Sequence, residues 1–408
     1  MLRNGSEDKT PFLYIKQGEN ENNRIKNIVL LGFGLRIIIL IYILTIGRSF
    51  STPYYVFDDQ NYELLAQKYL QYAQQAIDIP ALSTVRALNY LEIFWPCFIC
   101  ISAKTFGFIY AGRVFNCFFS AACIKTIYSI MCLLTDNEKT RLLPSKLFAF
   151  LPLSAIVCCF PIKDIFLMYG VLKIFHIIQM WHDDVRVNKL ALIWAALLFL
   201  GISRTRGAII ESLLIITCVM ALHKFYKKGQ SLFAVSFSAV LVICIFLFGN
   251  DIFSSFRTKV DDYSAVMETG NRIKYIQMNS ILELYKLPAS YFYATLQPFL
   301  LDFFTRGRAS YWVYIMGILN ISIYPIAIGN LVYAFLRKHS IILWISTTAL
   351  MAGISALSLG NSRHYLFCLP YTMINFSLAI ESEKKWIKQV VLYGSIGIFA
   401  VIFIISII

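Results

Sequence analysis

Residues 28–46, IVLLGFGLRIIILIYILTI, establish the class of fold, because they form an apolar run with one charged residue, Arg36. A helix needs about 20 such residues to cross the hydrocarbon core of a bilayer. Runs of similar length recur to the end of the chain. Of its 408 residues, 58% are hydrophobic and 15% are charged, whereas a soluble chain carries roughly 25% charged residues. The sequence predicts an all-α, polytopic helical membrane bundle in which residues 1–408 form a single transmembrane domain.

The formal net charge of +14 does not indicate nucleic-acid binding. Many basic residues sit in short loops between apolar runs, as is typical of cytoplasmic loops in membrane proteins. The ten cysteines lie in or beside apolar stretches, so no disulfide framework is expected. The polar segment 1–27 does not have the pattern of a cleaved signal peptide. No phosphate-binding Gly-Lys-Ser/Thr loop or GxGxxG signature is found, so a soluble nucleotide is not an expected ligand.

The basic residues also predict the topology. The segments expected in the cytoplasm are the N-terminal tail, 135–146, 182–189, 224–228, 337–339 and 384–388. The outer loops are then 48–87 and 250–310. The predicted spans are 28–46, 147–160, 165–181, 190–202, 207–223, 232–249, 311–336, 341–359, 365–380 and 390–408. The apolar region 88–134 fits either three short crossings or one crossing with a re-entrant helix, which gives about eleven to thirteen transmembrane helices in total.

The first outer loop contains Phe57-Asp58-Asp59-Gln60-Asn61-Tyr62. Two adjacent carboxylates at a membrane border are costly unless they stay hydrated, bind a cation or transfer protons. Residues 61–76 place tyrosines and apolar residues at helical spacing, which predicts a helix on the membrane surface. Asp58 or Asp59 would cap this helix, and the pair is also suited to act as a general base or to bind a divalent cation.

Three further charged clusters fall on the same outer face in this topology. They are Lys163-Asp164, Arg204 with Arg206, and Arg363-His364. Arginine grips phosphate oxygens through paired hydrogen bonds and lysine acts as a point charge, so the clusters suit a phosphate-bearing ligand. Each also has a purely structural explanation, as a local ion pair, as side chains that reach the membrane interface, or as polar residues of a turn.

Charged residues inside the predicted spans are expected to pair or to reach the membrane surface. Arg36, Lys125, Lys173 and Glu211 are of this kind. Arg113 differs, because Gly112-Arg113-Val114-Phe115-Asn116 opens a span near the outer side. We therefore add Arg113 to the candidate phosphate-binding residues. The five histidines do not have the spacing of a metal site.

These features resemble a known pattern. An aspartate pair followed by a tyrosine after the first span is similar to the first outer loop of GT-C-type glycosyltransferases, multi-span enzymes that use polyprenyl-linked sugar donors. Pro161-Ile162-Lys163-Asp164 resembles their second acidic position, although here a lysine precedes the acid. Residues 287–299, Gly360-Asn361-Ser362-Arg363-His364 and Pro370 resemble elements of membrane proteins in bacterial surface-polysaccharide assembly, including O-antigen and capsule polymerases.

The resemblance implies a GT-C-like glycosyltransferase in the bacterial inner membrane, with its active site on the outer face. The catalytic carboxylates would be Asp58, Asp59 and Asp164. The phosphate of a polyprenyl-(pyro)phosphate-linked saccharide would be bound by Lys163, Arg204, Arg206, Arg363, His364 and Arg113. A divalent cation at Asp58 and Asp59 is the one cofactor that this interpretation admits. Membrane lipids and other polysaccharide-assembly membrane proteins are the further partners expected.

Three functions stay open at this point. The leading interpretation is a polymerase that joins lipid-linked repeat units of an O-antigen, lipopolysaccharide or capsule. The first alternative is a GT-C transferase that adds one sugar from a polyprenyl-phosphate donor. The second alternative is a transporter or flippase, in which the same arginines would bind the pyrophosphate of a lipid-linked glycan without chemistry.

Overall fold

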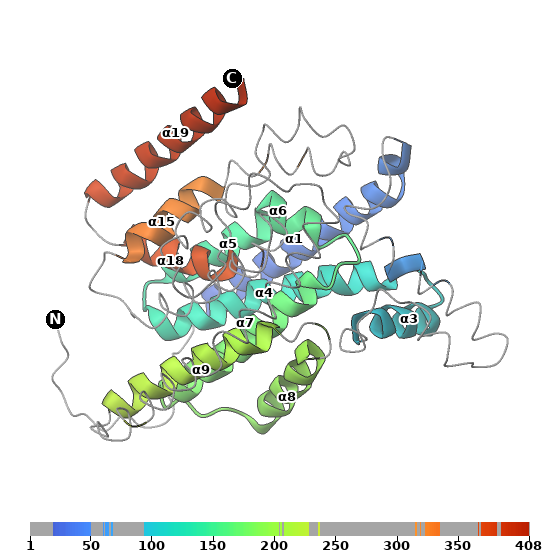
Figure 1. Cartoon of the computed structure of the whole chain (residues 1–408), viewed down its shortest axis with the longest axis horizontal. Coiled ribbons are helices and arrows are strands. Elements are labelled where there is room, and N and C mark those ends of the chain that lie inside the picture. The colour runs from blue at the N-terminus through green and yellow to red at the C-terminus, as the bar shows by residue number, and fades with distance from the viewer. Residues whose placement is uncertain are drawn as a thin grey trace.

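A computed structural model gives the arrangement of the helices (Figure 1). The structure describes residues 19–49, 60, 62–64, 67, 94–203, 205, 208–227, 236, 315, 319, 323–334, 366, 369–381 and 385–407. These residues are mostly helical, and no strand occurs among them. The helices are α1 (Glu19–Leu44), the short 3-10 helix η1 (Ile46–Ser49), α3 (Phe94–Phe106), α4 (Ala111–Leu134), α5 (Glu138–Phe150), α6 (Pro152–Val157), α7 (Asp164–His182), α8 (Lys189–Ser203), α9 (Ala208–Lys227), α15 (Tyr324–Ala334), α18 (Leu369–Glu381) and α19 (Lys385–Ile407).

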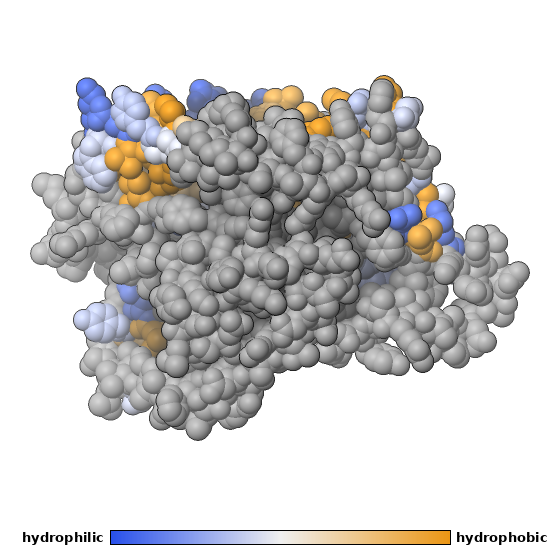
Figure 2. Space-filling model, turned by 45° about the horizontal axis from the view of Figure 1, so that its top comes forward, coloured by the Kyte–Doolittle hydropathy of each residue, from blue (hydrophilic) through white to orange (hydrophobic). Residues whose placement is uncertain are grey.

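Three of the described helices are long and apolar enough to cross a membrane. They cover Asn20–Leu44, Ala111–Leu134 and Asp164–His182. Large apolar side chains also lie on the surface, where a bilayer would cover them, as Leu30 and Leu190 do with 66% and 72% of their surface exposed. In Figure 2, apolar side chains (orange) lie at the surface of the described part beside polar ones (blue). These features support the predicted class, a helical membrane protein.

The undecided region 88–134 contains one long helix and one short one. α4 has 24 residues, enough for a full crossing. α3 has 13 residues and is about 20 Å long, too short to span the hydrocarbon core. Gly107 lies between them at φ 62°, a backbone conformation that glycine adopts without strain. Within residues 94–134 the structure thus has one helix long enough to cross and one shorter apolar helix. Whether the shorter helix is re-entrant, as the second predicted alternative requires, stays a prediction.

Residues 135–160 differ from the prediction. The expected loop 135–146 is largely helical, because Asn137 caps α5 by accepting hydrogen bonds from the backbone N–H groups of Lys139 and Thr140 at 3.0 and 3.4 Å. The expected continuous span 147–160 is instead broken at Leu151, which is extended because Pro152 follows it. Two consecutive helices, α5 and α6, therefore connect the end of α4 to the start of α7.

Arg36 of α1 stabilises this break. Its Nη1 donates to the carbonyl of Ala149 at 2.9 Å and its Nη2 to that of Phe148 at 3.1 Å. Ser154 Oγ also donates to the carbonyl of Phe148 at 2.6 Å and lies 3.0 Å from that of Leu151. The last carbonyls of a helix carry partial negative charge and lack partners within the helix. A fully buried arginine is thus accommodated at the negative end of α5.

Side-chain contacts establish how the helices run relative to one another. Arg24 of α1 forms an ion pair with Glu138 at the start of α5, with 2.8 Å between Nη1 and Oε1. Thr135, directly after α4, donates to Glu381 at the end of α18 at 3.2 Å. The start of α1 and the ends of α4 and α18 therefore lie at one end of the bundle.

The ends of α7 and α9 lie side by side. His182 Nε2 contacts His223 Nδ1 at 2.9 Å, and Lys224 Nζ lies 2.9 Å from a carboxylate oxygen of Asp184. With α8 returning between them, α7 and α9 run parallel. We use the term basic end for the cytoplasmic-type segments that carry Arg24, Arg141, His182 and Lys224. All four residues belong to segments that the sequence predicts to be cytoplasmic. The side of the membrane that the basic end faces stays a prediction.

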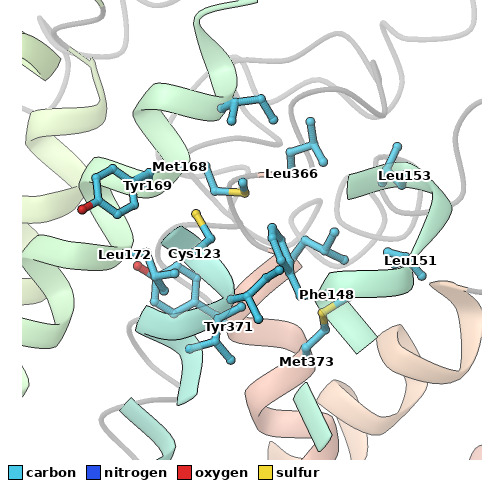
Figure 3. Packing of buried hydrophobic residues seen from close by; sticks show 14 of the residues in the cluster. Cys123, Phe148, Leu151, Leu153, Met168, Tyr169, Leu172, Leu366, Tyr371 and Met373 are labelled. Carbon is cyan, nitrogen blue, oxygen red and sulfur yellow. The ribbon is translucent and has the colours of Figure 1, made fainter. Parts of the chain in front are cut away.

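The core lies where α4, α5, α7 and α18 pack together (Figure 3). Phe175 of α7 meets Tyr371 of α18 edge to face, with ring centroids 5.1 Å apart. Leu366 is fully buried in the same cluster as Met168, which lies one turn into α7 (Figure 3).

The structure describes some of the other predicted spans and loops but not all of them. The predicted spans at 165–181, 190–202 and 207–223 coincide with α7, α8 and α9. Those at 311–336, 365–380 and 390–408 overlap α15, α18 and α19. The spans 232–249 and 341–359, the loop 250–310 and most of the surface helix 61–76 lie outside the described residues.

Candidate functional site

A buried ion pair joins Glu63, in the loop predicted to be the first outer one, to α4. Arg113 Nε lies 2.6 Å from Glu63 Oε1, and Arg113 Nη2 donates to Glu63 Oε2 at 2.8 Å. The two side chains are 0% and 1% exposed. A charge buried in a membrane bundle needs a partner with good geometry, and the paired guanidinium–carboxylate contact supplies it. Glu63 is therefore held at the start of α4 by Arg113.

The turn before α7 is fixed by two buried donors. Asn116 Nδ2 donates to the carbonyls of Phe160 and Ile162, both at 2.8 Å. Trp95 Nε1 of α3 donates to the carbonyl of Pro161 at 3.0 Å. These carbonyls have no partners within a helix, and the two side chains satisfy them in a water-poor interior.

The same turn lies directly beside Arg113, whose guanidinium carbon is 5.9 Å from the centre of the Phe160 ring. A second aromatic ring, that of Tyr110, is 5.4 Å away. Arginine over an aromatic face is favourable, more so where water is excluded. The ion pair and the turn thus form one unit, which we name the Glu63 end: Glu63, Arg113, Asn116 and residues 160–164.

Lys163 and Asp164 complete this unit. Lys163 is half-buried at the position that caps α7, and Asp164 is 1% exposed in the first turn of α7. A carboxylate in the first turn of a helix is favoured by the free N–H groups and the helix dipole. The buried acid and the neighbouring cation stand at the same end of the bundle as Arg113.

The end of α8 packs against this part of α7. A Cβ on Gly201 would lie 2.8 Å from Cζ of Phe166 and 3.3 Å from Cζ of Phe94, so the absence of a side chain permits the close approach. Thr205, fully buried, donates to the carbonyl of Gly201 at 2.6 Å. Thr205 stands between Arg204 and Arg206 in the chain, and these two arginines lie outside the described residues.

The predicted site residues divide into two groups. Arg113, Lys163 and Asp164 are described, and the structure brings them together. The others lie outside the described residues: Asp58, Asp59, Arg204, Arg206, Arg363 and His364. Their neighbours in the chain, Glu63, Thr205 and Leu366, are described and buried.

The sequence did not identify Glu63, Asn116 or Trp95 as site residues. A signal for Glu63 existed, because Arg113 near a membrane border requires an anion and Glu63 follows the aspartate pair. In the structure, Nε and Nη2 of Arg113 are bound to the carboxylate of Glu63. The predicted role of Arg113 as a phosphate ligand stays a prediction.

The other charged residues predicted in spans differ in their surroundings. Arg36 is buried and bound to carbonyls, Lys125 is exposed and Lys173 is half-buried. Asp58 and Asp59, the predicted ligands of a divalent cation, lie outside the described residues. Within the part of the chain that the structure describes, the one group of three potential ligands is Cys117, Cys158 and Cys159.

The Glu63 end combines a buried carboxylate, a half-buried ammonium group and aromatic walls at the end of a membrane bundle. Such an arrangement can orient a hydroxyl group and stabilise a nearby anion. The chain was compared with family models, with curated proteins and with solved structures, and none of them matches it.

Proposed function

We propose that the chain is a membrane glycosyltransferase that acts on polyprenyl-(pyro)phosphate-linked glycans, and that it polymerises repeat units of a bacterial surface polysaccharide. The observation that supports this most is the meeting of the Glu63–Arg113 pair with the Lys163-Asp164 turn at one end of the bundle. The Glu63 end would face the outer side of the cytoplasmic membrane, since the basic end carries the cytoplasmic-type segments.

In the proposed reaction, an acceptor hydroxyl attacks the sugar carbon that bears the phosphate. The new bond forms between acceptor oxygen and sugar carbon, the carbon–oxygen bond to the polyprenyl-(pyro)phosphate breaks, and a carboxylate accepts the hydroxyl proton. Asp58 or Asp59 is the proposed base, or the ligand of a divalent cation. Asp164 orients the substrates from the first turn of α7.

The leaving (pyro)phosphate accumulates negative charge as the bond breaks. Lys163, Arg204, Arg206, Arg363 and His364 are the proposed groups that stabilise it. Arg113 has a different proposed role. By binding Glu63, it holds the loop that carries the aspartate pair against the turn that carries Lys163 and Asp164.

The test is a paired substitution at the two ends of α7 in the presence of a defined lipid-linked repeat unit. Asp164→Asn should lower glycan chain extension at least about 100-fold in proteoliposomes, because a positioned carboxylate contributes on this scale. Asp184→Asn, two residues beyond the other end of α7, should leave extension unchanged. Asp184 has φ 58°, a conformation that asparagine tolerates well, so this control preserves the fold. Full activity of Asp164→Asn would contradict the role of Asp164.

A transporter of lipid-linked glycans is the second candidate, and the break between α5 and α6 favours it. Interrupted helices buried among other helices recur around the binding sites of transporters. The two functions differ in product. A strain without the protein should accumulate single repeat units on the outer leaflet if it polymerises them, and on the inner leaflet if it transports them. Accumulation of a truncated unit would instead indicate a transferase for one sugar.

A further inference from the structure

Three cysteines lie together directly behind the turn that precedes α7. Cys117 belongs to α4, while Cys158 and Cys159 follow α6. Their sulfur atoms all lie within 4.8 Å of one another. All three side chains are 0% exposed. Two segments about forty residues apart in the chain thus place three thiols at one buried point.

The separation of the sulfur atoms suits a shared metal ion. Thiolates bind such ions at about 2.3 Å, which puts ligand sulfurs roughly 4 Å apart. The three thiols would have to move by less than about 1 Å to reach this spacing. Cys117 Sγ makes a long contact to the carbonyl of Cys158, at 4.0 Å. Cys158 and Cys159 donate to the carbonyl of Ala155 at 3.1 and 3.3 Å.

A permanent positive charge lies next to the cluster. Arg36 is fully buried, and its Nε donates to Ser120 Oγ at 2.8 Å. The Ser120 hydroxyl in turn contacts the thiol of Cys158. Cys159 Sγ also lies 3.2 Å from the backbone carbonyl oxygen of Arg36, an alternative acceptor for its one S–H group. Among the residues that the structure describes, no carboxylate pairs with Arg36, and the α5 dipole offsets only about half a charge.

We propose that Cys117, Cys158 and Cys159 form a buried binding site for a thiophilic metal ion, Cu⁺. Binding replaces two thiol protons: Cu⁺ and three thiols give a complex of two thiolates and one thiol, and two protons are released. No electron is transferred. The complex has a net charge of −1, which complements the +1 charge of Arg36.

The number and kind of donors select the ion. Zn²⁺ in structural sites takes four ligands, and no fourth histidine, cysteine or carboxylate joins this group in the described part of the chain. Soft sulfur ligands select Cu⁺, which accepts three of them in a plane. The site links α4 to the segment before α7. Occupancy therefore fixes the turn that Asn116, the neighbour of Cys117, already holds through Phe160 and Ile162.

The experiment is a competition for Cu⁺ between the purified full-length protein in detergent and a chromophoric Cu⁺ chelator under reducing conditions. The native protein should remove one Cu⁺ ion per protein chain from the chelator. Cys117→Ala and Cys159→Ala should weaken binding at least about 100-fold, since loss of mere supporting contacts around a metal already costs 10–100-fold. Cys123→Ala is the matched control, because Cys123 is also 0% exposed on α4 and lies outside the group.

A second measurement on the native protein does not depend on the folding of variants. Copper X-ray absorption of the loaded protein should show three sulfur neighbours, and Cu⁺ should raise the unfolding temperature of native protein and of Cys123→Ala alike. The proposal is overturned if the native protein does not compete for Cu⁺, if Cys123→Ala loses as much affinity as Cys117→Ala, or if Zn²⁺ displaces Cu⁺.

Discussion

Two arginine–glutamate pairs at opposite ends of the bundle hold their charges in opposite ways. At the Glu63 end, Arg113 and Glu63 are 0% and 1% exposed and are joined by two contacts. At the basic end, Arg24 and Glu138 form one contact of 2.8 Å, with 57% and 43% of their side chains exposed. The chemical groups are the same. The surroundings decide whether a pair fixes geometry at a high desolvation cost or adds little in water.

The other charges of the basic end are spread over several contacts between different helices. Lys224, whose side chain is 9% exposed, lies 4.3 Å from the centre of the Trp181 ring and 2.9 Å from Asp184, whose side chain is 64% exposed. The Arg141–Glu21 pair is buried, with 7% and 8% of the side chains exposed. The Glu63 end, in contrast, concentrates its polar contacts on one loop and one turn, as expected of a site that must hold reacting groups in place.

The largest expected effect is that of Glu63→Gln. The substitution removes the carboxylate opposite a buried arginine, and breaking such a pair costs about 3–5 kcal/mol. Unfolding in mixed detergent–SDS micelles measures the loss. In the double variant Glu63→Gln/Arg113→Gln, the loss should be smaller than the sum of the single losses. Strict additivity would show that the two side chains do not interact, and would remove the anchor from the Glu63 end.

Arg36→Met should have the next largest effect. It deletes the donors to the carbonyls of Phe148 and Ala149 at the break between α5 and α6. Hydrogen bonds from a charged group contribute about 1.5–3 kcal/mol, so we expect a loss of roughly 2–3 kcal/mol. Arg36→Lys should lie between native and Arg36→Met, because an ammonium group can still donate to a carbonyl. Native stability of Arg36→Met would mean that the break does not need this side chain.

Asn116→Ala removes both hydrogen bonds to the turn before α7. The expected loss is about 1–2 kcal/mol, since neutral hydrogen bonds contribute less than charged ones. The more specific readout is local. Amide hydrogen exchange measured by mass spectrometry should accelerate in residues 160–164 and stay unchanged in α5. Uniform acceleration over the whole chain would indicate general destabilisation, and would contradict a local role for Asn116.

Glu138→Gln should cause the smallest loss of stability among these variants. Because the Arg24–Glu138 pair is largely exposed, its loss should change stability by less than about 1 kcal/mol, and added salt should reduce that change further. The measurement is the same micelle unfolding used for Glu63→Gln. An effect as large as that of Glu63→Gln would show that burial does not distinguish the two pairs.

Part of this structure could be predicted from the sequence. The predicted span 165–181 differs from α7, Asp164–His182, by one residue at each end. The reason is local: an uninterrupted apolar run is bounded by charged residues. The start of α5 could not be predicted in the same way. Its polar residues resemble a loop, and Arg141 is held by Glu21 of α1, 3.3 Å away, a contact that the local pattern does not contain.

The candidate site shows the same limit. The sequence predicted that Lys163 and Asp164 share an end with Arg113, because hydropathy and basic loops order the helices. It did not predict Glu63 as the partner of Arg113. The two are 50 positions apart, and only the folded bundle brings them together. Sequence reasoning identifies a costly buried charge, while its partner is determined by tertiary packing.

The central claim is that the charged clusters meet at one end of the bundle, on the outer face of the membrane. Labelling of introduced cysteines with a membrane-impermeant thiol reagent in intact spheroplasts tests it most directly, with the unsubstituted chain as background. We expect Ser203→Cys and Ser362→Cys to react in intact cells. Arg186→Cys, at the basic end, should react only after permeabilisation. Protection of either serine position until permeabilisation, or labelling of Arg186→Cys from outside, would contradict the account.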